Sequence, residues 1–592
     1  MLFVSQFFRS WHRWFIICLA SFILLGVGGC SIENFRAEAA QGTELIIGQL
    51  GDPKTFNAAL SKEYPNVFLY TYEGLVGTNG FTAEVEPALA ESWEISDDSL
   101  RIVFTLREGL KWSDGEPLTA DDVIFTYNEI YFNEKIPSST RDVLRVGESG
   151  AFPTVTKLDD RRVEFQLPEP FSPLLRSLSA EILPEHVLRP TIEQKDEKGN
   201  PIFNSTWGTD TDPKNAIVNG PYRLSQYIPS QRVIFERNSY YWRKDERSVP
   251  QPYIDRLIWQ IVENQNTQLL QFRSGGLSAV AVRPQYFSLL KREEKRSNFT
   301  IYEDGPDFGT SFIAFNLNRG KNPNGTPVVD PIKSKWFNDL NFRKAVAHAI
   351  DRTTMINTIY RGLGELQHSP ISIQSPYYYP PEKGLPTYEY DVEKAKQLLF
   401  ASGFQYNDRE QLLDADGNRV EFTLITNAGN QVREAMGAQI KQDLSQIGIK
   451  VNFTPIDFNK LVSQLSNSLD WECHLLGFTG GVEPHGGLTI WSPEGRLHNF
   501  NQNRKDPPLE GRQVEEWERE IERLFIQGSQ EFDEELRKEI YGQAQTIVQE
   551  NLPFIYLVNP FSMAAVRNEI QGVQYSALGG PFWNLYELSI EE

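Results

Sequence analysis

The segment from Glu84 to Ile130 constrains the fold of this 592-residue chain more than any other. Every second residue from 102 to 106 is large and apolar, which predicts a strand with one buried face. Another strand at 93–95 precedes it across a polar turn, and a short packing helix is predicted at 88–90. Gly115 can take the positive φ of a tight turn, and Thr119 can cap a following helix. The segment therefore predicts a small α+β unit.

Two motifs in this segment, PALAESW and FTLREGLKWSDGEPLTADDV, closely resemble the signature of the peptide/nickel class of bacterial extracellular solute-binding proteins. Members of that class are the capture subunits of ABC importers. Later segments resemble the same family in its own order: NGPYRLSQYIPSQRVIFERNSYYW, FNDLNFRKAVAHAIDRTTMINTIYRGLG, DVEKAKQLLFASGF and IKQDLSQIGIKVNF. The resemblance extends from about residue 44 to about residue 560.

The rest of the chain alternates between helical and strand patterns. Polar residues that cap helices and glycines that end them separate the elements, and such short connections favour a layered α/β architecture. The predicted strands cover residues 43–48, 222–227, 232–237, 254–262, 312–317, 449–453 and 471–478, and the predicted helices begin near residues 266, 339, 351, 391 and 432.

The resemblance implies an α/β fold of the two-lobed periplasmic-binding-protein type with an additional α/β domain. The first lobe would be discontinuous, and hinge closure would enclose the ligand between the lobes. The predicted domains are lobe I at 43–75, 216–308 and 561–592, the additional domain at 76–215, and lobe II at 309–560.

The N-terminus has the features of a lipoprotein signal at residues 1–29. Two arginines precede an apolar run at 15–29, which is marginal for spanning a bilayer. The run ends in Val27-Gly28-Gly29-Cys30, which looks like a lipobox and implies lipid attachment at Cys30. Residues 30–42 are predicted to be a flexible tether. The alternatives are an ordinary signal or an uncleaved anchor.

Composition excludes several classes of protein. The three cysteines are Cys18, Cys30 and Cys473, so the mature domain has no disulfide framework. Cys473 is predicted to be buried and inert. Residues 1–29 hold two arginines and no acid, so their removal takes the net charge from −21 to −23. Such a protein should be repelled by nucleic acid.

No catalytic motif stands out, so the chain is predicted to be neither an enzyme nor a cofactor or metal protein. The only compact acid–histidine group is Glu483-Pro484-His485, which would need further ligands to hold a metal. A lipid-anchored hydrolase or a chaperone is the alternative from another class.

The residues from Leu475 to Pro484 resemble the family's "GW … D … P" loop, which lines the cleft of peptide-binding members. There, main-chain groups pair with the peptide as in strand addition, and an aspartate binds the peptide's amine. Phe478 takes the place of the tryptophan and Gly481 that of the aspartate, so Glu483 becomes the candidate acid. Otherwise the ligand has no free amine, or Glu483 faces solvent. With aromatics from predicted loops, the candidate ligand-binding residues are Tyr70, Tyr72, Gly477, Phe478, Thr479, Gly481, Glu483 and Trp491.

These features together predict a monomeric receptor, lipid-anchored on the periplasmic side of the cytoplasmic membrane or on the outer cell surface. It would deliver a peptide to the permease subunits of an ABC importer. An oligosaccharide is the alternative ligand, because the loop aromatics also suit sugar rings. A nickel chelate or an opine-like ligand is less favoured.

Overall fold

A computed structural model describes residues 42–61, 66–138, 140–147, 149–504 and 507–591. The chain divides into residues 1–44 and a compact body of residues 45–592. The predicted signal segment, Cys30 and nearly all of the tether lie outside the described residues. In the part that the structure describes, no helix combines the length and apolar character needed to cross a membrane.

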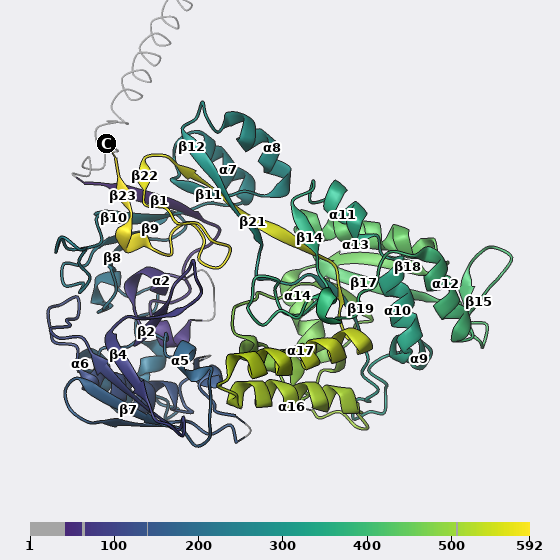
Figure 1. Ribbon diagram of the computed structural model, residues 1–592, viewed down its shortest axis with the longest axis horizontal. Coiled ribbons are helices and arrows are strands. Elements are labelled where there is room, and N and C mark those ends of the chain that lie inside the picture. Colours follow the sequence, from purple (N-terminus) through teal and green to yellow (C-terminus); the bar gives the residue numbers. More distant parts are fainter. Residues whose placement is uncertain (1–41, 62–65, 139, 148, 505–506, 592) are drawn as a thin grey trace, which may run out of the picture. The chain divides into compact units, whose positions relative to one another are not determined.

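An eight-stranded sheet contains strands from both ends of the chain (Figure 1). Its order is β12-β21-β11-β1-β10-β9-β8, and β14 pairs with β21. Strands β1 and β11 are parallel, whereas β8, β9 and β10 form an antiparallel meander. The strands are β1 (Glu44–Gln49), β8 (Tyr222–Ile228), β9 (Arg232–Arg237), β10 (Arg256–Ile261), β11 (Ala279–Ala281), β12 (Phe299–Pro306), β14 (Gly364–Leu366) and β21 (Val558–Arg567). Helices α7 (Gln265–Arg273) and α8 (Pro284–Glu293) connect β10, β11 and β12.

A separate antiparallel sheet of order β4-β5-β7-β6 follows the first strand in sequence. It consists of β4 (Ala90–Ile95), β5 (Arg101–Leu106), β6 (Thr154–Lys157) and β7 (Arg162–Gln166). The helices of the chain between β1 and β8 are α2 (Phe68–Thr71), α3 (Ala120–Ile124), α4 (Thr140–Val143), α5 (Leu174–Ser177) and α6 (Glu185–Glu193). One hydrophobic core contains residues of this sheet and of the eight-stranded sheet.

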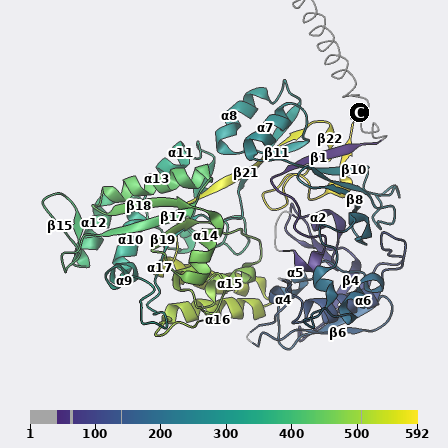
Figure 2. The same ribbon diagram turned by 180° about the vertical axis from the view of Figure 1, so that it is seen from behind.

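A five-stranded sheet of order β18-β17-β19-β13-β20 has its own core, from Phe312 to Val558. Its strands are β13 (Phe312–Phe315), β17 (Glu421–Asn427), β18 (Lys450–Ile456), β19 (Cys473–Leu476) and β20 (Ile555–Tyr556). Strand β17 is parallel to both β18 and β19. The helices are α9 (Pro331–Asn338), α10 (Leu340–Ala349), α11 (Arg352–Thr358), α12 (Val392–Ala401), α13 (Gln431–Ser445), α14 (Phe458–Ser463), α15 (Leu488–Trp491), α16 (Glu516–Gln530) and α17 (Glu534–Asn551). Helices α16 and α17 pack against each other in both views (Figures 1 and 2).

Two of the segments that carry the chain between the eight-stranded and five-stranded sheets are the one from β12 to β13 and the one from β20 to β21. They are hydrogen-bonded to each other. The amide of Asp307 donates to the carbonyl of Pro560 over 2.9 Å, and the Asn559 side chain donates to the Asp307 carbonyl over 2.8 Å. Such paired crossing segments are suited to act as a hinge.

The predicted turn and cap of the opening segment are confirmed. Gly115 has a φ of 95°, and Thr119 caps α3 in a reciprocal capping box with Asp122. The helix predicted at 88–90 is wrong, because residues 88–89 form a bend and Ala90 begins β4, with the amides of Ala88 and Ala90 both donating to the carbonyl of Leu75. The loop predicted at Tyr70 is also wrong, since this residue lies in α2.

Candidate functional site

The candidate site begins where β19 ends, at residues 477–483, here called the cleft segment. Its glycines allow backbone to lie against backbone. A Cβ on Gly477 would lie 2.1 Å from the Thr310 carbonyl oxygen, and one on Gly480 would lie 1.5 Å from that of Phe308. The Thr310 amide also donates to the carbonyl of Phe478 over 2.8 Å. The cleft segment is therefore fixed along residues 308–310.

A cavity of about 370 Å³, the smaller cavity, lies against this segment. Five of the predicted site residues line this cavity: Phe478, Thr479, Gly481, Glu483 and Trp491. A sixth predicted residue, Gly477, directly precedes Phe478 in the chain. Among the described residues, nothing lies within 4 Å of a Cβ built on Gly481, so this position is open.

The two predicted aromatics of the smaller cavity differ in exposure. Phe478 is half-buried, with its ring 5.0 Å from that of Phe312. Trp491 is only 3% exposed and packs against Phe525 and Phe554. Its role in the structure is therefore mainly to support the cavity wall.

Glu483 is paired inside the protein. Its carboxylate accepts from the guanidinium of Arg537 over 2.5 Å and from the amide of His485 over 3.1 Å. Burial opposes the charge of Arg537, but Glu483, Tyr541 and Tyr377 together outweigh it and raise the pKa of Arg537 above its ordinary value. Burial also lowers the pKa of His485 to about 4, so this histidine is neutral near pH 7. An incoming amine would have to share Glu483 with Arg537.

Tyr70 and Tyr72 line a second cavity of about 870 Å³, the larger cavity, which Val482 of the cleft segment also lines. The Tyr72 hydroxyl donates to the carbonyl of Ile217 over 2.8 Å, and burial raises the pKa of Tyr72. The Tyr70 ring lies edge-on to Trp259 at 6.0 Å. These tyrosines contribute ring surface to the wall of the larger cavity.

Two parts of the larger cavity were not predicted from the sequence. One is Glu73, whose carboxylate accepts from Tyr241 over 2.5 Å and from Trp242 over 2.7 Å. The other is the C-terminal segment with Trp583 and Tyr586. Because Glu73 and Tyr241 are 168 positions apart, no local pattern could join them. The only available signal was the dense cluster of aromatics at 240–242.

The described residues contain no group of three or more histidine, cysteine or acidic side chains placed to hold a metal ion. Cys473 is fully buried in β19, and burial raises the pKa of its thiol well above the ordinary value. The prediction of a buried cysteine is confirmed.

Comparison with known proteins places this arrangement in a family. Residues 84–496 match the model of the bacterial extracellular solute-binding proteins, family 5. A probable ABC transporter-binding protein of Deinococcus radiodurans is 30% identical over 553 residues, which cover 88% of each chain. The oligopeptide-binding protein AppA of Bacillus subtilis is 25% identical over 572 residues and 95% of each chain.

Solved structures show the same two-lobed fold. That of Bacillus subtilis AppA in complex with a nonapeptide has a TM-score of 0.70 at 24% identity, covering 93% of this chain and 99% of AppA. MelB of Agrobacterium fabrum in complex with stachyose has a TM-score of 0.74 at 20% identity, covering 93% of this chain and 85% of MelB. The family match and the Deinococcus relative show that this chain belongs to family 5 of the bacterial extracellular solute-binding proteins.

Proposed function

We propose that this protein is the substrate-binding subunit of an ABC importer, and that it captures an extended peptide and delivers it unchanged to membrane permease subunits. Family membership supports the transport role. Relatives named for oligopeptide and dipeptide binding support the ligand class.

The observation that carries the peptide proposal is the unpaired backbone of the cleft segment. Within the part of the chain that the structure describes, the amides of Thr479, Gly480 and Gly481 donate no hydrogen bond to the protein. All three residues are exposed, and they follow β19 closely in the chain without belonging to a strand themselves. An extended peptide could pair with these groups as an added strand, which gives affinity that depends little on side-chain identity.

The two cavities offer room for the ligand's side chains on either side of the cleft segment. Together they supply apolar and aromatic walls with few charged groups, as is usual for ligand sites. Glu73 and Arg176 are the charged residues that line the larger cavity.

Acetylating the amino terminus of a bound peptide is expected to weaken binding by less than about threefold, because Glu483 already pairs with Arg537. Loss of a true buried charge pair would cost about 2–5 kcal/mol. Isothermal titration calorimetry with a peptide and its N-acetylated twin measures this difference, on wild type and on Glu483→Ala. A loss of thirtyfold or so on acetylation, absent from Glu483→Ala, would show that Glu483 anchors the amine after all.

An oligosaccharide is the second candidate ligand, because MelB has the same fold and binds stachyose. The aromatic residues Phe582, Trp583 and Tyr586 in the larger cavity could stack on sugar rings. Calorimetry with a mixed peptide pool and with an oligosaccharide pool separates the two candidates. Heat from sugars alone would replace the peptide proposal.

We further propose that the protein is a monomer anchored by lipid at Cys30, on the periplasmic side of the membrane or on the outer cell surface. Cys30→Ser is expected to leave the precursor unlipidated and to move the protein out of the detergent phase in a Triton X-114 partition, because stable anchoring needs more than one acyl chain. Cys473→Ser is the control and should not change the partition. Unchanged partitioning of Cys30→Ser would instead identify the intact apolar segment as the anchor.

A further inference from the structure

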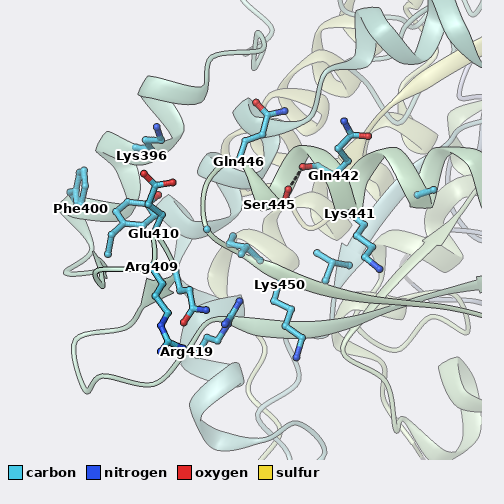
Figure 3. A pocket seen from close by; sticks show the side chains of 16 residues that line it. Lys396, Phe400, Arg409, Glu410, Arg419, Lys441, Gln442, Ser445, Gln446 and Lys450 are labelled. Carbon is cyan, nitrogen blue, oxygen red and sulfur yellow. Dashed lines mark hydrogen bonds between the residues drawn. The ribbon is translucent and has the colours of Figure 1, made fainter.

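A third cavity, of about 890 Å³, carries a charge opposite to that of the chain. It shares no lining residue with the two cavities of the candidate site. Five basic side chains and one acidic side chain line it, and we call it the basic pocket (Figure 3). The six are Lys396 of α12, Arg409 and Glu410 of the 405–413 hairpin, Arg419 beside β17, Lys441 of α13 and Lys450 of β18.

This concentration of cations is unusual for the composition, since the chain has 79 acidic and 58 basic residues. Two of the lysines are neutralised locally: Lys396 pairs with Glu393 at 3.1 Å and Lys450 with Glu421 at 2.8 Å. Among the described residues, Arg409, Arg419 and Lys441 form no ion pair. The pocket therefore has three lining cations that are not held in an ion pair by the described residues.

The hairpin that carries Arg409 is fastened to the rest of the pocket. The amide of Leu412 donates to the Gly448 carbonyl over 3.1 Å, and the Tyr406 hydroxyl donates to the Ile447 carbonyl over 3.0 Å. Gly448 has a φ of 73°, and a Cβ there would lie 2.7 Å from the Glu410 carbonyl oxygen. The pocket is therefore a fixed feature of the fold.

An aromatic edge completes the pocket. Phe400 is 53% exposed, and its ring lies edge-on to Tyr406 at 5.6 Å. The amide side chains of Gln442 in α13 and of Gln446, the residue that caps its C-terminal end, add hydrogen-bonding groups (Figure 3).

We propose that the basic pocket binds a small anion carrying two or more phosphate groups, independently of the ligand in the cleft. Guanidinium groups bind phosphate through paired hydrogen bonds, and lysine adds a mobile point charge. Three lining cations outside ion pairs match a multiply charged anion better than a single carboxylate does. The cavity volume suits a ligand of small-molecule size. The phosphates could belong to a soluble oligophosphate or to a lipid headgroup.

Calorimetry with tripolyphosphate, and co-sedimentation with phosphatidylcholine vesicles containing phosphatidic acid, test this proposal. The variant is Arg409→Gln combined with Arg419→Gln, and the matched control is Lys394→Gln, an exposed lysine of α12 outside the pocket. Each lost charge-assisted contact is expected to weaken binding about tenfold, so the double variant should bind about a hundredfold more weakly.

Tripolyphosphate binding that is lost in the double variant and kept in the control supports a soluble anion. Vesicle binding with the same pattern and no tripolyphosphate binding supports a lipid headgroup. Absence of binding to both probes, or equal binding by variant and control, overturns the proposal. Peptide affinity in the cleft should be the same in all three proteins, so failure here is distinguishable from failure of the peptide proposal.

Discussion

Gly480→Ala is expected to weaken ligand binding by at least about tenfold and to lower the free energy of unfolding by about 1–3 kcal/mol. The added Cβ would lie 1.5 Å from the carbonyl oxygen of Phe308, and neither backbone can yield by a rotamer change. The cleft segment must therefore move away from residues 308–310. Because its free amides are the proposed ligand contacts, that movement removes their alignment. Calorimetry and urea unfolding measure the two effects.

Gly481→Ala is the matched control, because nothing lies within 4 Å of a Cβ at that neighbouring position. Its unfolding free energy should stay within about 0.5 kcal/mol of wild type. If Gly480→Ala and Gly481→Ala have the same ligand affinity and the same free energy of unfolding, then the close approach of Gly480 to Phe308 is not needed for binding or for stability.

Arg537→Met is expected to lower the free energy of unfolding by about 3 kcal/mol, because it leaves the carboxylate of Glu483 largely buried without its partner. The side chains of Arg537 and Glu483 are 8% and 16% exposed. Arg537 also donates to the carbonyl of Gly528 over 2.8 Å and to the hydroxyl of Tyr377 over 2.7 Å. Urea unfolding measures the loss.

Two further variants separate the unpaired charge from lost packing. Adding Glu483→Gln to Arg537→Met should recover part of the stability, because the uncompensated charge is then gone. Arg523→Gln removes a salt bridge of similar length from α16, 2.7 Å to Glu520, but on the exposed surface. It should cost less than about 1 kcal/mol. Equal losses for Arg523→Gln and Arg537→Met would show that burial of the Glu483 pair is not decisive.

Local patterns predicted much of the second half of the fold. Asp339, Asp351 and Asp391 cap helices that begin close to the predicted positions, since capping depends on residues only two or three positions apart. The helix prediction at 88–90 was wrong because the small apolar residues there are compatible with a helix, whereas hydrogen bonds to the carbonyls of Gly74 and Leu75 hold them in a bend that leads into β4. The predicted domain limits remain predictions.

The candidate site was predictable only where its residues are contiguous. The cleft segment could be located from its loop motif, and the structure brings four of its predicted residues, together with Trp491, to one cavity. The partner of Glu483 could not be found, because Arg537 lies 54 positions away on α17. Glu73 and its partners were missed for the same reason, and so was the basic pocket, whose cations come from five separate segments.

Native mass spectrometry of the purified protein tests the central claim, capture of a peptide, most directly. If the protein captures peptides, a fraction of the molecules should carry the added mass of a bound ligand. Dissociation of that ligand should give fragments whose masses differ by amino-acid residues. The bound material should also remain chemically unchanged on prolonged incubation, since the proposed role is delivery. Fragments spaced by hexose units, or turnover of the bound peptide, would contradict the account.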